Sequence, residues 1–134
     1  MITITKRMYF SASHRVFNPN FTEEENQNTF GKCNNPNGHG HNYTLEVSIK
    51  GDVNPNTGYV FDLKKLKNII NQEIIEKLDH KNLNYDVDFL QGIIPSSENI
   101  CIAIWSILKE KIKDAEIYEI KLYESLNSWV SYKG

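Results

Sequence analysis

The chain has 134 residues, 40% of them hydrophobic, and a formal net charge of -2 at pH 7. This length suits a single domain, residues 1–134, with a core of usable size, while the near-neutral charge and the lack of a Lys/Arg run exclude a typical nucleic-acid-binding protein. No segment has the apolar length of a membrane span or the core of a signal peptide, and two cysteines do not suggest a disulfide framework, so we expect a cytoplasmic protein without a membrane partner.

Two strands are predicted in the first half of the chain. Residues from Ile2 to about Val16, and again from His39 to about Lys50, alternate apolar and polar side chains with the period of two that half-buried strands show. The polar segment between them, residues 18–37, is predicted to be a loop, and its length favours a functional loop over a simple connection.

Two helices are predicted in the second half. Asp62 can cap a helix in which apolar residues keep a helical spacing as far as Leu78, so that one face is buried. After a loop-like stretch, Pro95-Ser-Ser-Glu98 has the hydroxyl caps and the first-turn carboxylate of a helix start. This second helix is expected to extend to about Lys113.

The chain ends in two further predicted strands. Ile117 to Glu124 and Trp129 to Tyr132 alternate again, and the residues between them suit a hairpin turn. The order of the elements predicts an α+β fold, in which an antiparallel sheet has both helices packed on one of its faces.

His39 and His41 are spaced i, i+2 in a predicted strand, so both imidazoles leave the same face of the sheet. His14, at the end of the first predicted strand, is the natural third ligand, and three imidazoles leave one open position on a tetrahedral Zn²⁺ ion. The alternative is that the four histidines of the chain, His80 among them, are ordinary polar residues. Their number and placement favour the metal site.

The two cysteines have different surroundings. Cys101 lies in an apolar helical stretch, where a small buried thiol is expected. Cys33 lies in a polar segment, separated by five residues from the histidine pair, where a nearby cation would favour the thiolate. Cys33 is therefore a candidate nucleophile or proton carrier beside the metal site.

Five short segments stand out, namely Ser11-Ala-Ser-His14, Cys33-Asn-Asn-Pro-Asn-Gly-His-Gly-His-Asn-Tyr43, Leu78-Asp-His-Lys-Asn-Leu83, Pro95-Ser-Ser-Glu-Asn99 and Leu122-Tyr-Glu-Ser125. In their order and approximate spacing the chain resembles the 6-pyruvoyl-tetrahydropterin synthase family over nearly its whole length. The resemblance implies a tunnelling fold, or T-fold, with a four-stranded antiparallel sheet and two helices on one side. It also implies trimers whose sheets join in a barrel, and a homohexamer of two trimers with active sites at subunit interfaces.

The resemblance further implies a reaction and its metal ion. The family's substrate is 7,8-dihydroneopterin triphosphate, from which its animal-type members form 6-pyruvoyl-tetrahydropterin with release of triphosphate and without an external redox cofactor. Carried over to this sequence, His14, His39 and His41 would bind Zn²⁺. The ion would stabilise negative charge as it develops on the side chain of the substrate.

Catalytic residues are implied in the same way. Cys33 resembles the proton-abstracting residue of the family, and Asp79 and His80 resemble its relay partners, with the carboxylate orienting the imidazole. Without the resemblance, Asp79 and His80 would be interpreted as a turn residue and a helix C-terminal histidine.

Glu124 resembles the anchor of the pterin ring, because a carboxylate can accept two parallel hydrogen bonds from the 2-amino group and the adjacent ring nitrogen. The alternative is a surface acid at a strand end. Ser97 and Glu98 are candidates for the same substrate pocket, although helix capping explains them equally well. The candidates for binding the triphosphate are Arg15, Lys32 and Lys81, because they lie beside motif residues.

Two alternative functions stay open. One is the bacterial 6-carboxy-tetrahydropterin synthase reaction of queuosine biosynthesis, which uses the same substrate and loses acetaldehyde. The five-residue gap between Cys33 and His39 resembles the animal-type enzyme and favours the pyruvoyl product. The other is a T-fold module that binds a pterin or purine without turnover, but such a module has no need of Cys33, Asp79 and His80 together.

Overall fold

Two long antiparallel strands form the centre of the sheet. The computed structural model describes residues 1–134, and its sheet has five strands in the order β3-β1-β2-β4-β5. β1 (Ile2–His14) pairs with β2 (His39–Gly51) from end to end, with His14 opposite His39. This register places the candidate metal ligands of both strands side by side at one end of the sheet.

Shorter strands complete the sheet on both sides. β4 (Glu116–Ser125) pairs antiparallel with β2 and continues as a hairpin into β5 (Ser128–Tyr132). On the other edge, β3 (Lys81–Asn82) lies parallel to β1. The predicted α+β class is confirmed, but the sheet has a fifth strand instead of the expected four. Two residues are too few to show a period of two, so the sequence contains no signal for β3.

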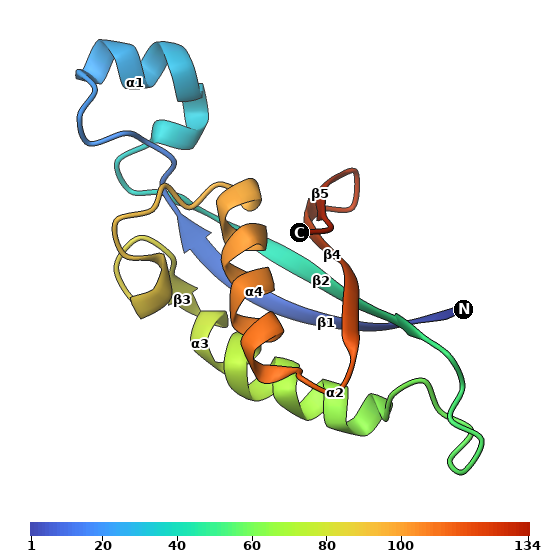
Figure 1. Ribbon diagram of the computed structural model, residues 1–134. Coiled ribbons are helices and arrows are strands. Elements are labelled where there is room, and N and C mark those ends of the chain that lie inside the picture. Colours follow the sequence, from blue (N-terminus) through green and yellow to red (C-terminus); the bar gives the residue numbers. More distant parts are fainter.

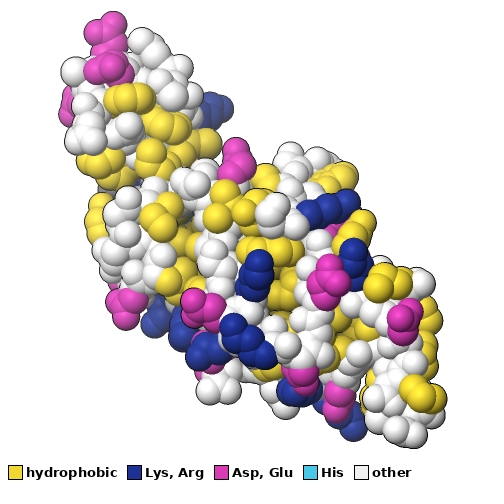
Figure 2. All heavy atoms as spheres, in the orientation of Figure 1, with side chains coloured by type: hydrophobic (Ala, Val, Ile, Leu, Met, Phe, Trp, Pro, Cys, Tyr) yellow, Lys and Arg dark blue, Asp and Glu magenta, His cyan; other side chains and the backbone are white.

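Both predicted helices lie on one face of the sheet (Figure 1). The first is a continuous rod made of α2 (Leu63–Ile70), a π-helical turn (Asn71–Ile75) and α3 (Glu76–Leu78), and the second is α4 (Ser97–Lys111). None of the helices has the combination of length and apolar character that crossing a bilayer requires. On the face seen in Figure 2, acidic and basic side chains are interspersed and form no continuous basic stripe.

Side-chain caps fix where the two helices begin. Asp62 Oδ1 accepts a hydrogen bond from Lys64 N at 2.9 Å, as predicted. At the start of α4, Ser96 Oγ accepts one from Asn99 N at 3.2 Å. Of the two adjacent serines, Ser96 is therefore the cap, and the hydroxyl of Ser97 is not used for capping.

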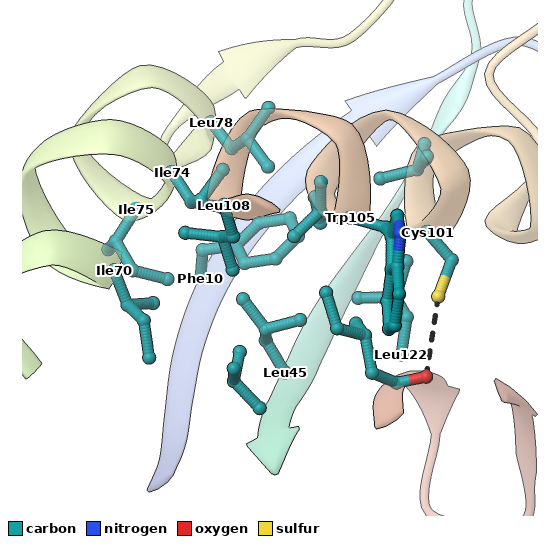
Figure 3. Close-up of a cluster of buried hydrophobic side chains, with 14 of the residues drawn as sticks. Phe10, Leu45, Ile70, Ile74, Ile75, Leu78, Cys101, Trp105, Leu108 and Leu122 are labelled. Atoms are coloured by element: carbon teal, nitrogen blue, oxygen red, sulfur yellow. Dashed lines mark hydrogen bonds between the residues drawn. The ribbon is translucent and has the colours of Figure 1, made fainter. Parts of the chain in front are cut away.

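The core lies between the sheet and the helices (Figure 3). Alternate side chains of β2 from Tyr43 to Ile49 are fully buried, as the period-2 pattern predicts. Cys101 on α4 is also buried, and its thiol donates a hydrogen bond to Ile120 O at 3.6 Å. Burial raises the pKa of the Cys101 thiol to about 12, so this cysteine is an inert part of the core.

The segment predicted as a loop, residues 18–37, contains a helix. α1 (Glu23–Phe30) and the 3-10 helix Gly31–Asn34 follow β1 and lie apart from the two-layer body (Figure 1). Thr22 and Glu25 form a reciprocal capping box, with bonds of 3.0 and 3.1 Å. The sequence contained this signal, but α1 has no apolar stripe, so hydrophobic periodicity could not reveal it.

Candidate metal centre and active site

Three histidines converge where β1 and β2 end. His14 lies opposite His39 across the strand pair, and His41 is two residues further along the same face of β2. One nitrogen from each of these imidazoles lies within 4.8 Å of the others, and the Nε2 atoms of His14 and His39 are 3.1 Å apart. The strand pairing thus brings together the three residues that the sequence identified as candidate ligands.

The His14 imidazole is held in one tautomer. Its Nδ1 lies 2.7 Å from Pro95 O, and because a carbonyl oxygen can only accept, Nδ1 carries the hydrogen. The lone pair of Nε2 therefore faces the other two imidazoles. Sequence reasoning gave Pro95 no such role, because a contact across 81 positions leaves no local signal.

The three imidazoles fit a metal ion. Burial lowers the pKa of His14 and of His41, so both rings are neutral at pH 7 and can act as ligands. His41 Nε2 is buried without a hydrogen-bond partner, a costly arrangement that a bound cation would relieve. Three nitrogen ligands with space for another group are the donor set of a catalytic zinc site.

Glu124 lies next to this histidine cluster. Its Oε1 is 3.3 Å from His41 Nε2 and 3.4 Å from His14 Nε2, without the alignment of a hydrogen bond to His41. Ile120 and Leu122, which share its parity in β4, are fully buried, so Glu124 continues the packed face of the strand. A carboxylate in this place contributes negative charge beside the three imidazoles.

Cys33 lies in the 3-10 helix that precedes β2. Its side chain is exposed, and it lines one hollow with His39 and a second hollow with Glu124, Ser97 and Glu98. Ser97 Oγ is buried at the second hollow without a hydrogen-bond partner. Cys33 and the three substrate-binding candidates therefore surround one space next to the histidine cluster.

Asp79 and His80 lie beside β1, where each lines a hollow that His41 lines as well. Asp79 Oδ1 accepts a hydrogen bond from Ser11 N at 2.9 Å, which lowers the pKa of this carboxyl, and its Oδ2 is 3.0 Å from His80 Nδ1. The carboxylate thus orients the imidazole, but the pair faces hollows that Cys33 does not line. Within one chain the structure does not bring Asp79 and His80 to Cys33.

The backbone of His80 is strained. Its φ of 60° lies in the left-handed region, and no other non-glycine residue of the chain has a positive φ. Such a conformation costs about 1–2 kcal/mol in an ordinary residue and is retained mainly where a function needs it. The side chain is 82% exposed, so burial of the imidazole does not explain the strain.

The triphosphate candidates also lie in different places. Lys32 lines the hollow that Cys33 and His39 line, whereas Lys81 lines a different hollow together with His80. The guanidinium of Arg15 is hydrogen-bonded to protein groups.

Gly38 allows the segment that carries Cys33 to pass close to β1. Its φ is +73°, and an added Cβ would lie 2.9 Å from His14 O, so Gly38→Ala meets both backbone strain and a clash. We expect the free energy of unfolding to fall by about 2–4 kcal/mol, measured by urea denaturation. Gly58→Ala is the matched control, because Gly58 has a φ of +76° and nothing within 4 Å. Equal losses in the two variants would contradict the close approach to His14.

Comparisons with known proteins place these observations in a family context. A sequence profile of the family described as 6-pyruvoyl tetrahydropterin synthase matches residues 3–134. The human protein named 6-pyruvoyl tetrahydrobiopterin synthase is 43% identical over 131 residues, which cover 98% of this chain and 90% of the human one. An Archaeoglobus fulgidus protein named putative 6-carboxy-5,6,7,8-tetrahydropterin synthase is 39% identical over 95 residues, which cover 71% of this chain and 75% of the archaeal one.

The fold is similar to a solved structure as well. The structure of Caenorhabditis elegans 6-pyruvoyl tetrahydropterin synthase matches with a TM-score of 0.94 and 38% sequence identity, covering 99% of this chain and 95% of that chain. The similarity in sequence and in fold therefore extends over the whole domain, including every element that carries a candidate site residue.

Proposed function

The chain belongs to the 6-pyruvoyl tetrahydropterin synthase family, and we propose that it is a zinc-dependent lyase that converts 7,8-dihydroneopterin triphosphate into 6-pyruvoyl-tetrahydropterin with release of triphosphate. The observation that carries this proposal is the cluster of His14, His39 and His41, with the Glu124 carboxylate and the Cys33 thiol beside it. The substrate loses triphosphate and rearranges internally, so the reaction needs no external oxidant or reductant.

His14, His39 and His41 are the proposed zinc ligands. Zinc, when bound, supplies positive charge that stabilises negative charge developing on the reacting side chain of the substrate. The protein contributes orientation, because Pro95 O fixes the His14 ring, and it contributes neutral ligands, because burial disfavours protonation of His14 and His41.

Cys33 is proposed to remove and return protons at the side-chain carbons of the substrate. Its exposed thiol faces the space beside His39, where a substrate bound at the histidine cluster would present those carbons. A thiol is suited to this task because neighbouring positive charge can bring its pKa near the working pH.

Asp79 and His80 are proposed to serve as the relay for a cysteine of a neighbouring subunit. Within one chain they line hollows beside β1 that Cys33 does not line, and His80 is largely exposed. A homohexamer with active sites at subunit interfaces, as the family resemblance implies, would give this exposed pair a function and a reason for the strained His80 backbone.

Glu124 is proposed to anchor the pterin ring, with Ser97 and Glu98 lining the same pocket. The unpartnered Ser97 Oγ leaves a hydroxyl for the substrate, since Ser96 is the helix cap. We expect Glu124→Gln to raise KM about 10- to 100-fold, because it removes a charge-assisted pair of hydrogen bonds. Glu116→Gln, on the same strand but 65% exposed and paired with Lys50, is expected to leave KM unchanged. Steady-state kinetics of both variants would measure this difference in KM. An unchanged KM in Glu124→Gln would exclude the role of Glu124 as the pterin anchor.

Product analysis tests the proposed reaction. Zinc-loaded protein is incubated with 7,8-dihydroneopterin triphosphate, and the products are identified by mass spectrometry. 6-Pyruvoyl-tetrahydropterin with triphosphate is the expected result. 6-Carboxy-tetrahydropterin with acetaldehyde would instead assign the alternative activity, 6-carboxy-tetrahydropterin synthase, for which the archaeal relative is named. Tight pterin binding without any product would point to a binding module and overturn the lyase.

A further inference from the structure

The guanidinium of Arg15 is attached to the segment that carries Cys33. Its Nε donates a hydrogen bond to Asn34 O at 2.9 Å, and a terminal nitrogen donates to Asn34 Oδ1 at 3.0 Å. Val16 N adds a bond to Cys33 O at 2.8 Å. Two successive carbonyl groups, those of Cys33 and Asn34, are therefore tied to the residues that directly follow His14.

The backbone of Arg15 is itself held from the opposite side. Asn84 Oδ1 accepts a hydrogen bond from Arg15 N at 2.8 Å, and Asn84 Nδ2 donates to Arg15 O at 2.9 Å. The amide of Asn84 thus satisfies both backbone groups, as a neighbouring strand would. Asn84 belongs to the segment that begins with Asp79 and His80, so Arg15 connects this segment with the cysteine segment.

The geometry requires an arginine. Asn34 is buried and accepts two bonds from one planar group, and the guanidinium carbon lies 4.0 Å from the centre of the Phe17 ring. A lysine ammonium has a point charge without the planar fork, so it cannot reproduce both bonds and the stacking together. Two of the five guanidinium N–H groups are used within the protein, and both bonds go to Asn34, which supports a positioning role for Arg15.

We propose that Arg15 is a positioning residue, which holds Cys33 at a fixed distance from the histidine cluster through its two bonds to Asn34. This inference rests on the proposed function of Cys33 as the residue that moves the substrate's proton. Asn84 supports the arrangement by fixing the Arg15 backbone. Because misplacement of a reacting group by about 1 Å can cost 100-fold in rate, the effect should appear in kcat.

Arg15→Lys tests the proposal. We expect kcat to fall about 10- to 100-fold while KM changes less than about twofold and the zinc content stays the same. Arg7→Lys is the matched control, because the guanidinium of Arg7 in the middle of β1 also contacts one partner through two nitrogens, with Nε and a terminal nitrogen 2.8 and 2.7 Å from Glu46 Oε2. That variant is expected to keep the kcat of the unaltered protein.

Alkylation by iodoacetamide gives a readout that does not need turnover. Cys33 is exposed and Cys101 is buried, so the first reports on the local segment and the second on opening of the whole core. We expect Arg15→Lys to change the alkylation rate of Cys33 several-fold, because the thiol moves relative to the histidine cluster, and to leave Cys101 protected. An unchanged rate at Cys33 would contradict the positioning role. Faster modification of both cysteines would indicate general loosening and overturn a specific positioning role.

A second pair of variants covers the case in which Arg15→Lys does not fold. Asn34→Ala removes the side-chain oxygen that accepts one of the two bonds from Arg15, so it should lower kcat as Arg15→Lys does. Asn34→Asp keeps an acceptor at this position and should retain most of the kcat of the unaltered protein. If Cys33→Ala is inactive but Asn34→Ala or Arg15→Lys keeps full activity, the positioning role of Arg15 is refuted and the proposed function of Cys33 stands. Full activity of Cys33→Ala would instead refute the proposed function of Cys33, on which this inference rests.

Discussion

Replacement of Cys33 by alanine is expected to lower kcat by about 10³-fold, which is the range that a general acid–base group contributes. Cys33 is exposed at the hollow that it shares with His39, so its removal leaves the core and the histidine cluster unchanged. We therefore expect zinc content and pterin binding to stay the same. Steady-state kinetics, metal analysis and equilibrium binding of a substrate analogue would measure the three quantities separately.

The other cysteine provides the control. Cys101→Ala removes a thiol of similar size that is buried and whose pKa burial raises to about 12, so it should cost stability and leave kcat unchanged. Turnover of Cys33→Ala at the rate of the unaltered protein would exclude the proton-transfer role of Cys33, even if the product is the expected one.

The histidine cluster was predictable because its cause is local. Strand periodicity gives the face of each side chain, and His39 and His41 fall on the same parity as the buried residues Tyr43 and Leu45. His14 shares its parity with Phe10 and the antiparallel register then brings it beside His39. The proximity of the three imidazoles follows from these two rules, whereas their role as zinc ligands stays a prediction.

Other parts of the site had no local signal. The bonds of Arg15 to Asn34 and Asn84 join segments 19 and 69 positions apart, and a pair of asparagines in polar loops is unremarkable in the sequence. The same is true of Pro95 O beside His14. Positions in which a side chain binds a distant backbone group depend on tertiary structure, which composition and periodicity do not describe.

The separation of Asp79 and His80 from Cys33 shows a different limit. The contact between Asp79 and His80 follows from their adjacency, and the structure contains it. Their joint action with Cys33 came from the family resemblance, and a single chain does not contain that contact. Site residues inferred from a family need not meet within one subunit, because symmetric assemblies can place them on facing surfaces.

The proposed zinc ligands are expected to differ in their contribution to the fold, so two alanine variants should separate metal binding from stability. His39→Ala and His14→Ala should both lose zinc, because a site with two imidazoles binds far more weakly than one with three. His14 is fully buried and bonded to Pro95 O, whereas His39 is only partly buried. His14→Ala should therefore also lower the free energy of unfolding of the metal-free protein, by about 2–4 kcal/mol, through a cavity and an unpaired carbonyl.

Zinc content by mass spectrometry and urea denaturation with and without a chelator would measure both effects. The chelator should destabilise the unaltered protein, since zinc binds only the folded state, and should have little effect on either variant. His80→Ala serves as the control, because His80 is 82% exposed and lies outside the cluster, so zinc content should not change. If His39→Ala kept a full equivalent of zinc, the cluster would not be the metal site, and the close approach of the three imidazoles would need another explanation.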